Sequence, residues 1–225
     1  MLKDAKNGLK KVYFTDGVHL TYGYQKGKCW SKETVYVQSG YGRKRVNVLG
    51  FLDAATYQVI PVMDRKEKYL NADSVCKGLK KIREQNQDVQ QIYVILDNAA
   101  YQRCKKVKEA AKEYRIILVF LPPYSPNLNL IERFWKFLRN TLLSVYYYNS
   151  FDCFFDAVET FICTVHIHYK EKLASLLSFR VTIQNPATAG SKFRILAQYK
   201  FPSKSDRTHS NELNAKSQFA IGCKP

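Results

Sequence analysis

The sequence predicts an α/β fold built on a mixed β-sheet. Two apolar runs, Ile92–Leu96 and Ile116–Leu121, are continuous rather than alternating, as in strands that are covered on both faces. The segment Cys104–Tyr114 between them is rich in Lys, Ala and Glu and predicts a helix. Strand, helix and strand at this spacing are typical of a βαβ unit with parallel strands. Earlier in the chain, β-rich segments flank a turn, which indicates an antiparallel hairpin.

The first part of the chain is predicted to supply the remaining strands. Lys11–Thr15 is short and rich in β-forming residues. Arg45–Leu52 and Tyr57–Val62 flank Asp53–Thr56, which has the composition of a hairpin turn. Tyr22–Val37 is expected to contain a further strand of irregular pattern.

Three further helices are predicted from apolar residues at helical spacing. Ala72–Gln87 is the first of them, and Phe151–His168 is the last. The middle helix begins at Asn129, a favourable N-cap, with Glu132 three residues later as in a capping box. Its apolar stripe consists of Ile131, Trp135, Leu138 and Leu142.

Length and composition favour one main domain. The chain has 225 residues, and 46% of them are hydrophobic, which is enough for a sizeable core. We place this domain at residues 1–184. From residue 185 onward, loop-forming and polar residues prevail and apolar residues are sparse. Residues 185–225 are therefore predicted to be a poorly structured basic tail.

The net charge is strongly positive. The chain holds 36 Lys and Arg against 19 Asp and Glu, which gives +17. Seven basic and two acidic residues put +5 of this charge in the tail, so the predicted domain itself carries +12. An excess of this size points to a polyanionic partner, and nucleic acid is the first candidate. A basic surface without a partner is the alternative.

The sequence shows no sign of secretion or membrane insertion. The chain begins Met-Leu-Lys-Asp, without an apolar stretch of signal-peptide length, and contains no 18-residue uncharged apolar run. Its six cysteines form no C-x-x-C pair and match no zinc-binding spacing. These observations predict a cytoplasmic, DNA-associated protein without a membrane partner.

Three carboxylates stand close to predicted buried elements. Asp97 follows the strand Ile92–Leu96, and Glu132 lies in the first turn of the helix after the proline-rich run Leu121–Asn129, with 34 residues between the two acids. Asp16 follows the first predicted strand. Buried or half-buried acids are costly unless positive charge lies between them. Because Mg²⁺ prefers oxygen ligands, we expect a site for two Mg²⁺ ions where these acids converge.

Each acid also has a structural explanation when it is taken alone. Asp97 has the character of a turn former or helix cap after a strand. Glu132 is explained by the capping box, and Asp16 beside Gly17 by a turn.

The segments around the three acids resemble the DDE transposases of the Tc/mariner superfamily, especially those of bacterial insertion sequences. The resemblance covers about residues 11–183 and rests on Phe14–Asp16, Gly42–Gly50, Ile95–Ala99, Leu121–Asn129 and Ile131–Trp135. It implies an RNase H-like fold, a five-stranded mixed sheet with helices on both faces. It also implies that Asp16, Asp97 and Glu132 are the catalytic triad and bind two Mg²⁺ or Mn²⁺ ions.

The resemblance further implies DNA cleavage at the ends of a mobile element, followed by attack of the freed 3′ hydroxyl on target DNA. Element ends and target DNA are thus the expected partners, and holding two ends together is consistent with a homodimer. Surface cations often contact only water, and Asn98 is equally explained by a turn. The candidate DNA contacts are Arg43, Lys44, Arg45, Asn98, Arg133, Lys136 and Arg139.

The sequence departs from the family pattern at several positions. Gly17 stands where Glu is often found, Gln102 where His is common, and Leu130 where Pro usually precedes the Ile-Glu pair. None of these changes removes a triad carboxylate. Family members normally carry an N-terminal helix-turn-helix region that recognises the element's ends, whereas here the first predicted strand begins at residue 11. We expect that region to be separate, and hypothesise a split or frameshifted gene with the tail read in an unrelated frame.

Two other functions are compatible with the sequence. One is another RNase H-like nuclease, such as an enzyme that cuts RNA–DNA hybrids or DNA junctions, although the proline motif and the spacing of the acids argue against it. The other is a catalytically inactive, truncated remnant of a transposase that keeps the fold and binds DNA through its basic surface.

Overall fold

A five-stranded mixed sheet forms the centre of the molecule. The computed structural model describes residues 10–23, 44–65, 69–122, 128–143, 148–177, 180–183 and 195–198. The strand order is β3-β2-β1-β4-β5. β1, β2 and β3 are antiparallel neighbours, whereas β1, β4 and β5 are parallel, which confirms the mixed sheet and the βαβ unit. The strands are β1 (Lys10–Thr21), β2 (Arg45–Asp53), β3 (Val59–Met63), β4 (Gln91–Leu96) and β5 (Ile116–Phe120).

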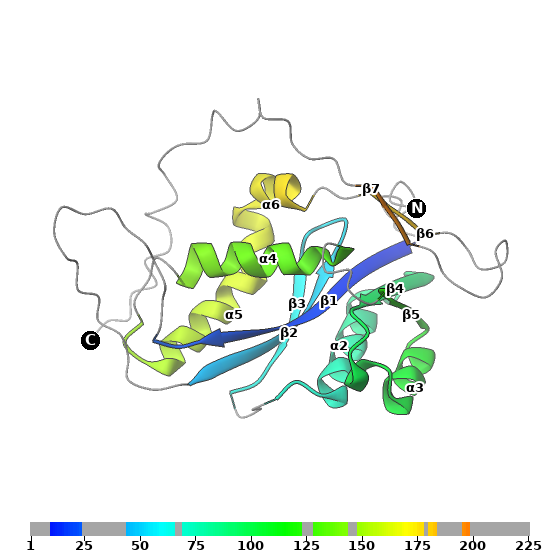
Figure 1. Ribbon diagram of the computed structural model, residues 1–225, viewed down its shortest axis with the longest axis horizontal. Coiled ribbons are helices and arrows are strands. Elements are labelled where there is room, and N and C mark those ends of the chain that lie inside the picture. The colour runs from blue at the N-terminus through cyan, green and yellow to red at the C-terminus, as the bar shows by residue number, and fades with distance from the viewer. Residues whose placement is uncertain are drawn as a thin grey trace.

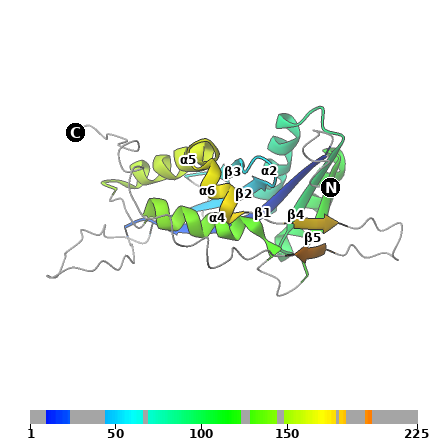
Figure 2. The ribbon, with the colours of Figure 1, turned by 90° about the horizontal axis from the view of Figure 1, so that it is seen from above.

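Helices cover both faces of this sheet (Figures 1 and 2). On one face lie α2 (Ala72–Gln85) and α3 (Lys105–Glu113). On the other lie α4 (Leu130–Leu138), α5 (Phe151–His168) and α6 (Lys170–Leu176), with a π-helical turn after α4. Successive side chains of each strand point to opposite faces, so the sheet separates two hydrophobic cores. The expected helices on both faces are thus confirmed.

Strand β1 is much longer than the predicted Lys11–Thr15. It pairs with β2 without interruption from Tyr13 to Thr21, so Asp16 and Gly17 lie within the strand rather than in a turn after it. The physical reason is burial. Val18 and Leu20, beyond the presumed turn, are almost completely buried in the core beneath α4 and α5. A turn at Asp16–Gly17 would leave these two side chains without a core.

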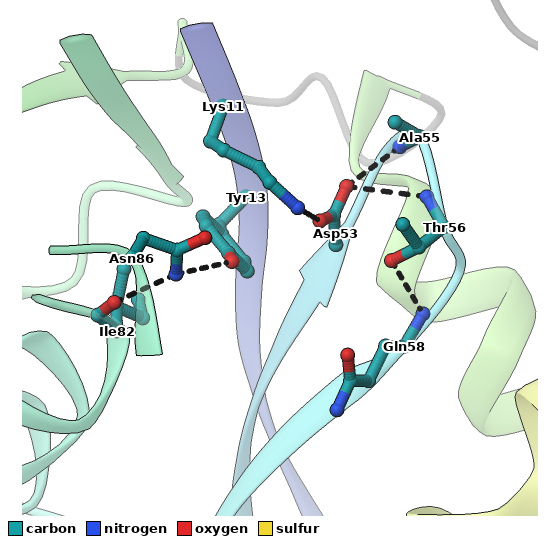
Figure 3. Close-up of polar contacts among 8 residues, drawn as sticks. All are labelled: Lys11, Tyr13, Asp53, Ala55, Thr56, Gln58, Ile82 and Asn86. Carbon is teal, nitrogen blue, oxygen red and sulfur yellow. Dashed lines mark hydrogen bonds and ion pairs between the residues drawn. The ribbon is translucent and has the colours of Figure 1, made fainter. Parts of the chain in front are cut away.

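A buried acid closes the hairpin between β2 and β3 (Figure 3). The carboxylate of Asp53 accepts a hydrogen bond from the backbone N–H of Ala55 at 2.7 Å and a longer one from Thr56 at 3.3 Å. Its second oxygen pairs with Lys11 Nζ at 2.6 Å. Because the Asp53 side chain is only 3% exposed, its charge needs this partner, and the pair joins β1 to the predicted Asp53–Thr56 turn.

Helix α4 packs directly on β1 and β2 because β2 contains a glycine at the contact. A Cβ atom on Gly50 would lie 2.6 Å from Cζ2 of Trp135 and 2.9 Å from Cδ1 of Ile131. Gly50 is opposite Asp16 in the β1–β2 register. Because Gly50 has no side chain, α4 can pack against the sheet next to Asp16.

Some predictions fall outside the described residues. The strand expected within Tyr22–Val37 lies mostly in residues 24–43, which the structure does not describe. In the predicted tail it describes β7 (Ile195–Gln198), which pairs with β6 (Arg180–Ile183). Residues 184–194 and 199–225 are not described, so the boundary at residue 184 and the poorly structured tail stay predictions. Among the helices that are described, none is long and apolar enough to cross a membrane.

A substitution at Gly50 tests how tightly α4 packs against β2. We expect Gly50→Ala to lower the free energy of unfolding by about 1–3 kcal/mol, the usual cost of inserting a methyl group into a packed core. Urea denaturation monitored by circular dichroism measures this change. Unchanged stability would show that Trp135 and Ile131 can move away at little cost, so that α4 is not held in one position.

Candidate active site

The sheet register brings Asp16 and Asp97 together. Parallel pairing of β1 and β4 runs from Lys10↔Gln91 to Phe14↔Ile95. Asp16 and Asp97 each lie two residues beyond the last pair of this register, so they stand near each other where the pairing of the two strands ends. Asp16 shares its strand face with Phe14, which is buried in the core beneath α4. The two acids thus come from neighbouring strands at the end of β4.

Helix α4 brings Glu132 to the same place. Asn129, the residue before the helix, donates a hydrogen bond from Nδ2 to the backbone oxygen of Thr15 at 3.1 Å. Thr15 immediately precedes Asp16, and Glu132 is in the first turn of α4. The start of the helix is therefore tied to the strand that carries Asp16. Asp97 and Glu132 are exposed and Asp16 is half-buried, so all three acids lie at an open edge of the molecule.

The predicted capping box is wrong. Asn129 is the N-cap residue, but its side chain makes no capping hydrogen bond. The amide instead reaches the Thr15 oxygen, and it is 2% exposed. Because Glu132 is exposed and has no capping partner in Asn129, a purely structural role in helix initiation does not account for it.

The electrostatics show that the three acids affect one another. The pKa of Asp16 is raised to about 7, first by burial and then by the negative charge of Asp97, with a smaller contribution from Glu132. Burial also raises the pKa of Glu132, and the charge of Asp97 adds to this effect. Repulsion between neighbouring carboxylates is the expected property of a site that binds cations.

Two other groups face the acids. The positive charge of Arg139, in the π-helical turn after α4, acts to lower the pKa of Asp16. Burial raises the pKa of the Tyr101 phenol, and the charges of Asp97 and Asp16 raise it further. The Tyr101 hydroxyl lies over Gly17, 4.0 Å from where a Cβ atom would stand. Sequence reasoning did not single out Tyr101, because a tyrosine after a buried strand carries no signal of its own.

The turn after Asp97 is held by a buried glutamine. Asn98 has φ of 75°, in the left-handed region that asparagine tolerates better than most residues. Oε1 of Gln102 accepts a hydrogen bond from Ala99 N–H at 3.2 Å, and the Gln102 N–H donates to the Ala99 oxygen at 3.0 Å. Gln102, found where the family commonly has His, is fully buried. It fixes the direction in which the chain leaves Asp97.

The candidate DNA contacts differ in their surroundings. Lys136 is exposed on α4 and Arg139 is exposed in the π-helical turn after it, whereas Arg133 is half-buried and donates to the Leu176 oxygen at 3.4 Å. Lys44 and Arg45 lie 5.6 Å from the ring centres of Phe151 and Tyr69, respectively. Asn98 has the conformation of a turn residue, and Arg43 lies outside the described residues. DNA contact by these residues stays a prediction.

Oxygen ligands alone make up the site, which suits a hard cation such as Mg²⁺ or Mn²⁺. In the described ranges, no group of three or more His, Cys, Asp or Glu side chains, the three acids included, is arranged so that it could hold a metal ion as it stands. The acids approach one another closely enough to interact by charge. Metal binding by Asp16, Asp97 and Glu132 therefore stays a prediction, supported by their placement.

Known proteins resemble this chain in sequence. Residues 11–153 match the family model of the DDE superfamily endonucleases. An uncharacterized protein, y4pE/y4sA of Sinorhizobium fredii (strain NBRC 101917 / NGR234), is 32% identical over 84 residues, which are 37% of this chain and 60% of that protein.

Solved structures share its fold. The Mos1 transposase paired-end complex with the left transposon end superposes with a TM-score of 0.51 at 11% identity, over 78% of this chain and 57% of that one. The mariner Mos1 paired-end complex with Mg gives 0.53 at 11% identity, over 78% and 56%. This chain thus spans little more than half the length of these mariner proteins. The RNase H-like fold implied by the sequence resemblance is confirmed.

The family match contains all three acids and more than half of the chain. Its extent agrees with the part of the sequence on which the resemblance to DDE transposases rests. The chain belongs to the DDE superfamily of endonucleases.

Proposed function

We propose that this protein is the catalytic domain of a DNA transposase, which cleaves phosphodiester bonds at the ends of a mobile element and joins the freed ends to target DNA. The observation that carries the proposal is the convergence of Asp16, Asp97 and Glu132 from β1, the end of β4 and the start of α4. Membership of the DDE endonuclease superfamily supports the same chemistry.

The three acids are proposed to hold two Mg²⁺ or Mn²⁺ ions. Their carboxylate oxygens have the right chemistry. The pKa of Asp16 is raised first by burial and then by the charge of Asp97, and bound cations would offset both effects. When bound, such a pair supplies activation of the attacking oxygen and stabilisation of the leaving oxygen. A solved complex of the related Mos1 fold is described as containing Mg, and another as containing Mn.

The protein's own residues would orient the substrate. Exposed Lys136 lies on the same helix as Glu132, and exposed Arg139 lies in the π-helical turn that follows it; cations there suit a phosphate backbone that runs past the acids. The net charge of +17 favours association with DNA generally. Arg43, Lys44, Arg45, Asn98 and Arg133 complete the proposed contact set.

The assembly is proposed by analogy with the family. Transposition requires two element ends to be held together, and a homodimer of this domain would meet that need. Sequence-specific recognition of the ends would come from a separate N-terminal helix-turn-helix region. The Mos1 structures with this fold are described as paired-end complexes, which supports a DNA-bound assembly of this type.

Metal-dependent cleavage tests the catalytic assignment. We expect the full chain to nick supercoiled DNA with Mn²⁺ and not with EDTA. Asp97→Asn should reduce the rate at least about 100-fold, because the metal ions contribute several kcal/mol to the barrier. Conversion of supercoiled to open-circular plasmid on agarose measures the rate.

A matched control is Asp88→Asn, an exposed acid before the opposite end of β4. It should nick at the wild-type rate. Equal nicking by the wild type and Asp97→Asn would refute the assignment and favour the inactive, DNA-binding remnant. Preference for RNA–DNA hybrids or branched junctions over linear duplexes would instead identify another RNase H-like nuclease.

Removing one acid should stabilise the metal-free protein at high pH. The pKa of Asp16 rises from its ordinary value of 3.8 to about 7 on folding. Between these values the folded protein keeps a proton that the unfolded chain has lost, so this group makes stability fall as pH rises from about 4 to about 7. Asp16→Asn should therefore gain about 2 kcal/mol at pH 8, given about 1.4 kcal/mol per pKa unit and partial screening by water.

Urea denaturation in EDTA at about pH 4 and at pH 8 measures this gain for both proteins. Near pH 4 the protonated Asp16 resembles asparagine, so the difference should largely vanish. Adding Mn²⁺ at pH 8 should stabilise the wild type more than Asp16→Asn. An equal difference at the two pH values would argue that ionisation of Asp16 does not oppose folding.

A further inference from the structure

Strands β1 and β4 diverge at the candidate site. Their regular pairing ends at Phe14↔Ile95, and the chain turns away after Asp97 through the left-handed Asn98. The oxygen of Leu96, the last residue of β4, accepts from Leu121 N–H at 2.8 Å on the β5 side. The fork between the two strands therefore opens at the level of the two aspartates.

One backbone oxygen of β1 points into this fork. Val12 O accepts a hydrogen bond from Ala54 N–H on the β2 side of β1, and successive carbonyls of a strand point to opposite neighbours. Thr15 O consequently points toward β4. Its partner at 3.1 Å is Nδ2 of Asn129, a side chain from outside the sheet. The Asn129 amide thus donates the hydrogen bond to Thr15 O that a backbone N–H of β4 would donate if the two strands remained paired.

The same residue also contacts the element that carries the third acid. The backbone oxygen of Asn129 accepts the N–H of Glu132 at 3.2 Å, which opens the first turn of α4. Through its side chain Asn129 is bonded to the residue before Asp16, and through its main chain to Glu132. Its amide lies on the β4 side of β1, next to the residue that precedes Asp16.

The second polar atom of this amide lacks a protein partner. Oδ1 of Asn129 is buried and accepts no hydrogen bond from the described residues. A buried acceptor without a donor is costly, and polar groups behind metal-binding carboxylates commonly bond to the ligands or their waters. An unpartnered acceptor in the residue that joins Thr15 to the first turn of α4 suits a role in supporting the acids.

We propose that Asn129 is a positioning residue that sets the spacing of Asp16, Asp97 and Glu132 for divalent-cation binding. This inference rests on the proposed function, since it assigns Asn129 a task at the same site. The amide bonds to Thr15 O and holds the carboxylates together in the absence of the cation, although they repel one another. Without it, α4 keeps its apolar contacts through Trp135 and Ile131, but Glu132 is no longer fixed relative to Asp16.

A second buried asparagine provides a matched control. Asn86, at the end of α2, is 8% exposed, and its Nδ2 donates to Ile82 O at 2.7 Å and to the Tyr13 hydroxyl at 3.0 Å (Figure 3). It lies on the opposite face of the sheet from α4. Replacing either asparagine by leucine removes a buried amide that donates to a backbone oxygen, but only one of the two amides lies beside the acids.

The experiment is a Mn²⁺ titration of the full-length wild type, Asn129→Leu and Asn86→Leu, followed by the electron paramagnetic resonance signal of free Mn²⁺. Asn129→Leu should weaken Mn²⁺ binding about 10- to 100-fold, the usual effect of losing a group that orients metal ligands. Asn86→Leu should bind Mn²⁺ as the wild type does while losing stability to urea. Asn129→Ala, which leaves space rather than filling it, should weaken binding like Asn129→Leu.

Each result decides the inference. Wild-type affinity in a folded Asn129→Leu or Asn129→Ala overturns it, and so does an equal loss of affinity in Asn86→Leu. If neither Asn129 variant folds, the amide serves the whole fold rather than the acids, and the inference is again overturned. Failure of the wild type itself to bind Mn²⁺, or binding that persists in Asp97→Asn, refutes instead the proposed metal site.

Discussion

The candidate site depends on the packing of α4 against the sheet. This helix contributes large buried side chains, among them Phe134 and Trp135, to the core between itself, α5 and the sheet. It can approach β2 only because Gly50 has no side chain. Burial of apolar surface thereby fixes the body of the helix on the sheet, and the hydrogen bond from Asn129 to Thr15 ties its exposed first turn, which carries Glu132, to the strand of Asp16. The apolar contacts of α4 thus stabilise an arrangement of carboxylates that repel one another.

Placing the three acids together costs electrostatic free energy mainly at one of them, Asp16. Asp97 and Glu132 are exposed to water, which screens their charges, and only Asp16 is half-buried. Arg139 adds a positive charge close to Asp16. Asp53, a buried acid at the end of β2, is paired with Lys11 of β1. Among the three acids, Asp16 is therefore the one whose ionisation burial and neighbouring charge oppose most.

Periodicity and turn composition predicted most elements because these depend on local sequence. The apolar runs of β4 and β5 and the stripe of α5 need no knowledge of distant residues. The extent of β1 was not predictable in this way, since Asp16–Gly17 has the local character of a turn and only pairing with β2 overrides it. Asn129 was likewise assigned to a cap, because the competing acceptor, Thr15 O, is 114 residues away in sequence. Gly50 did carry a signal: a glycine inside an apolar strand indicates close approach of another element.

Two of the departures from the family pattern, at Gly17 and Gln102, are explained by their surroundings. At Gly17, Cδ1 of Leu70 lies 2.5 Å from the position of a Cβ atom, so a larger residue would displace Leu70. A glutamate there would also add a fourth negative charge beside a carboxylate whose pKa is already raised. Gln102 keeps the hydrogen-bond acceptor that the Ala99 N–H requires, and as a neutral amide it does so without adding a charge behind Asp97. Both residues lie next to an aspartate and fit their local surroundings, so these two departures concern the support of the acids and not the acids themselves.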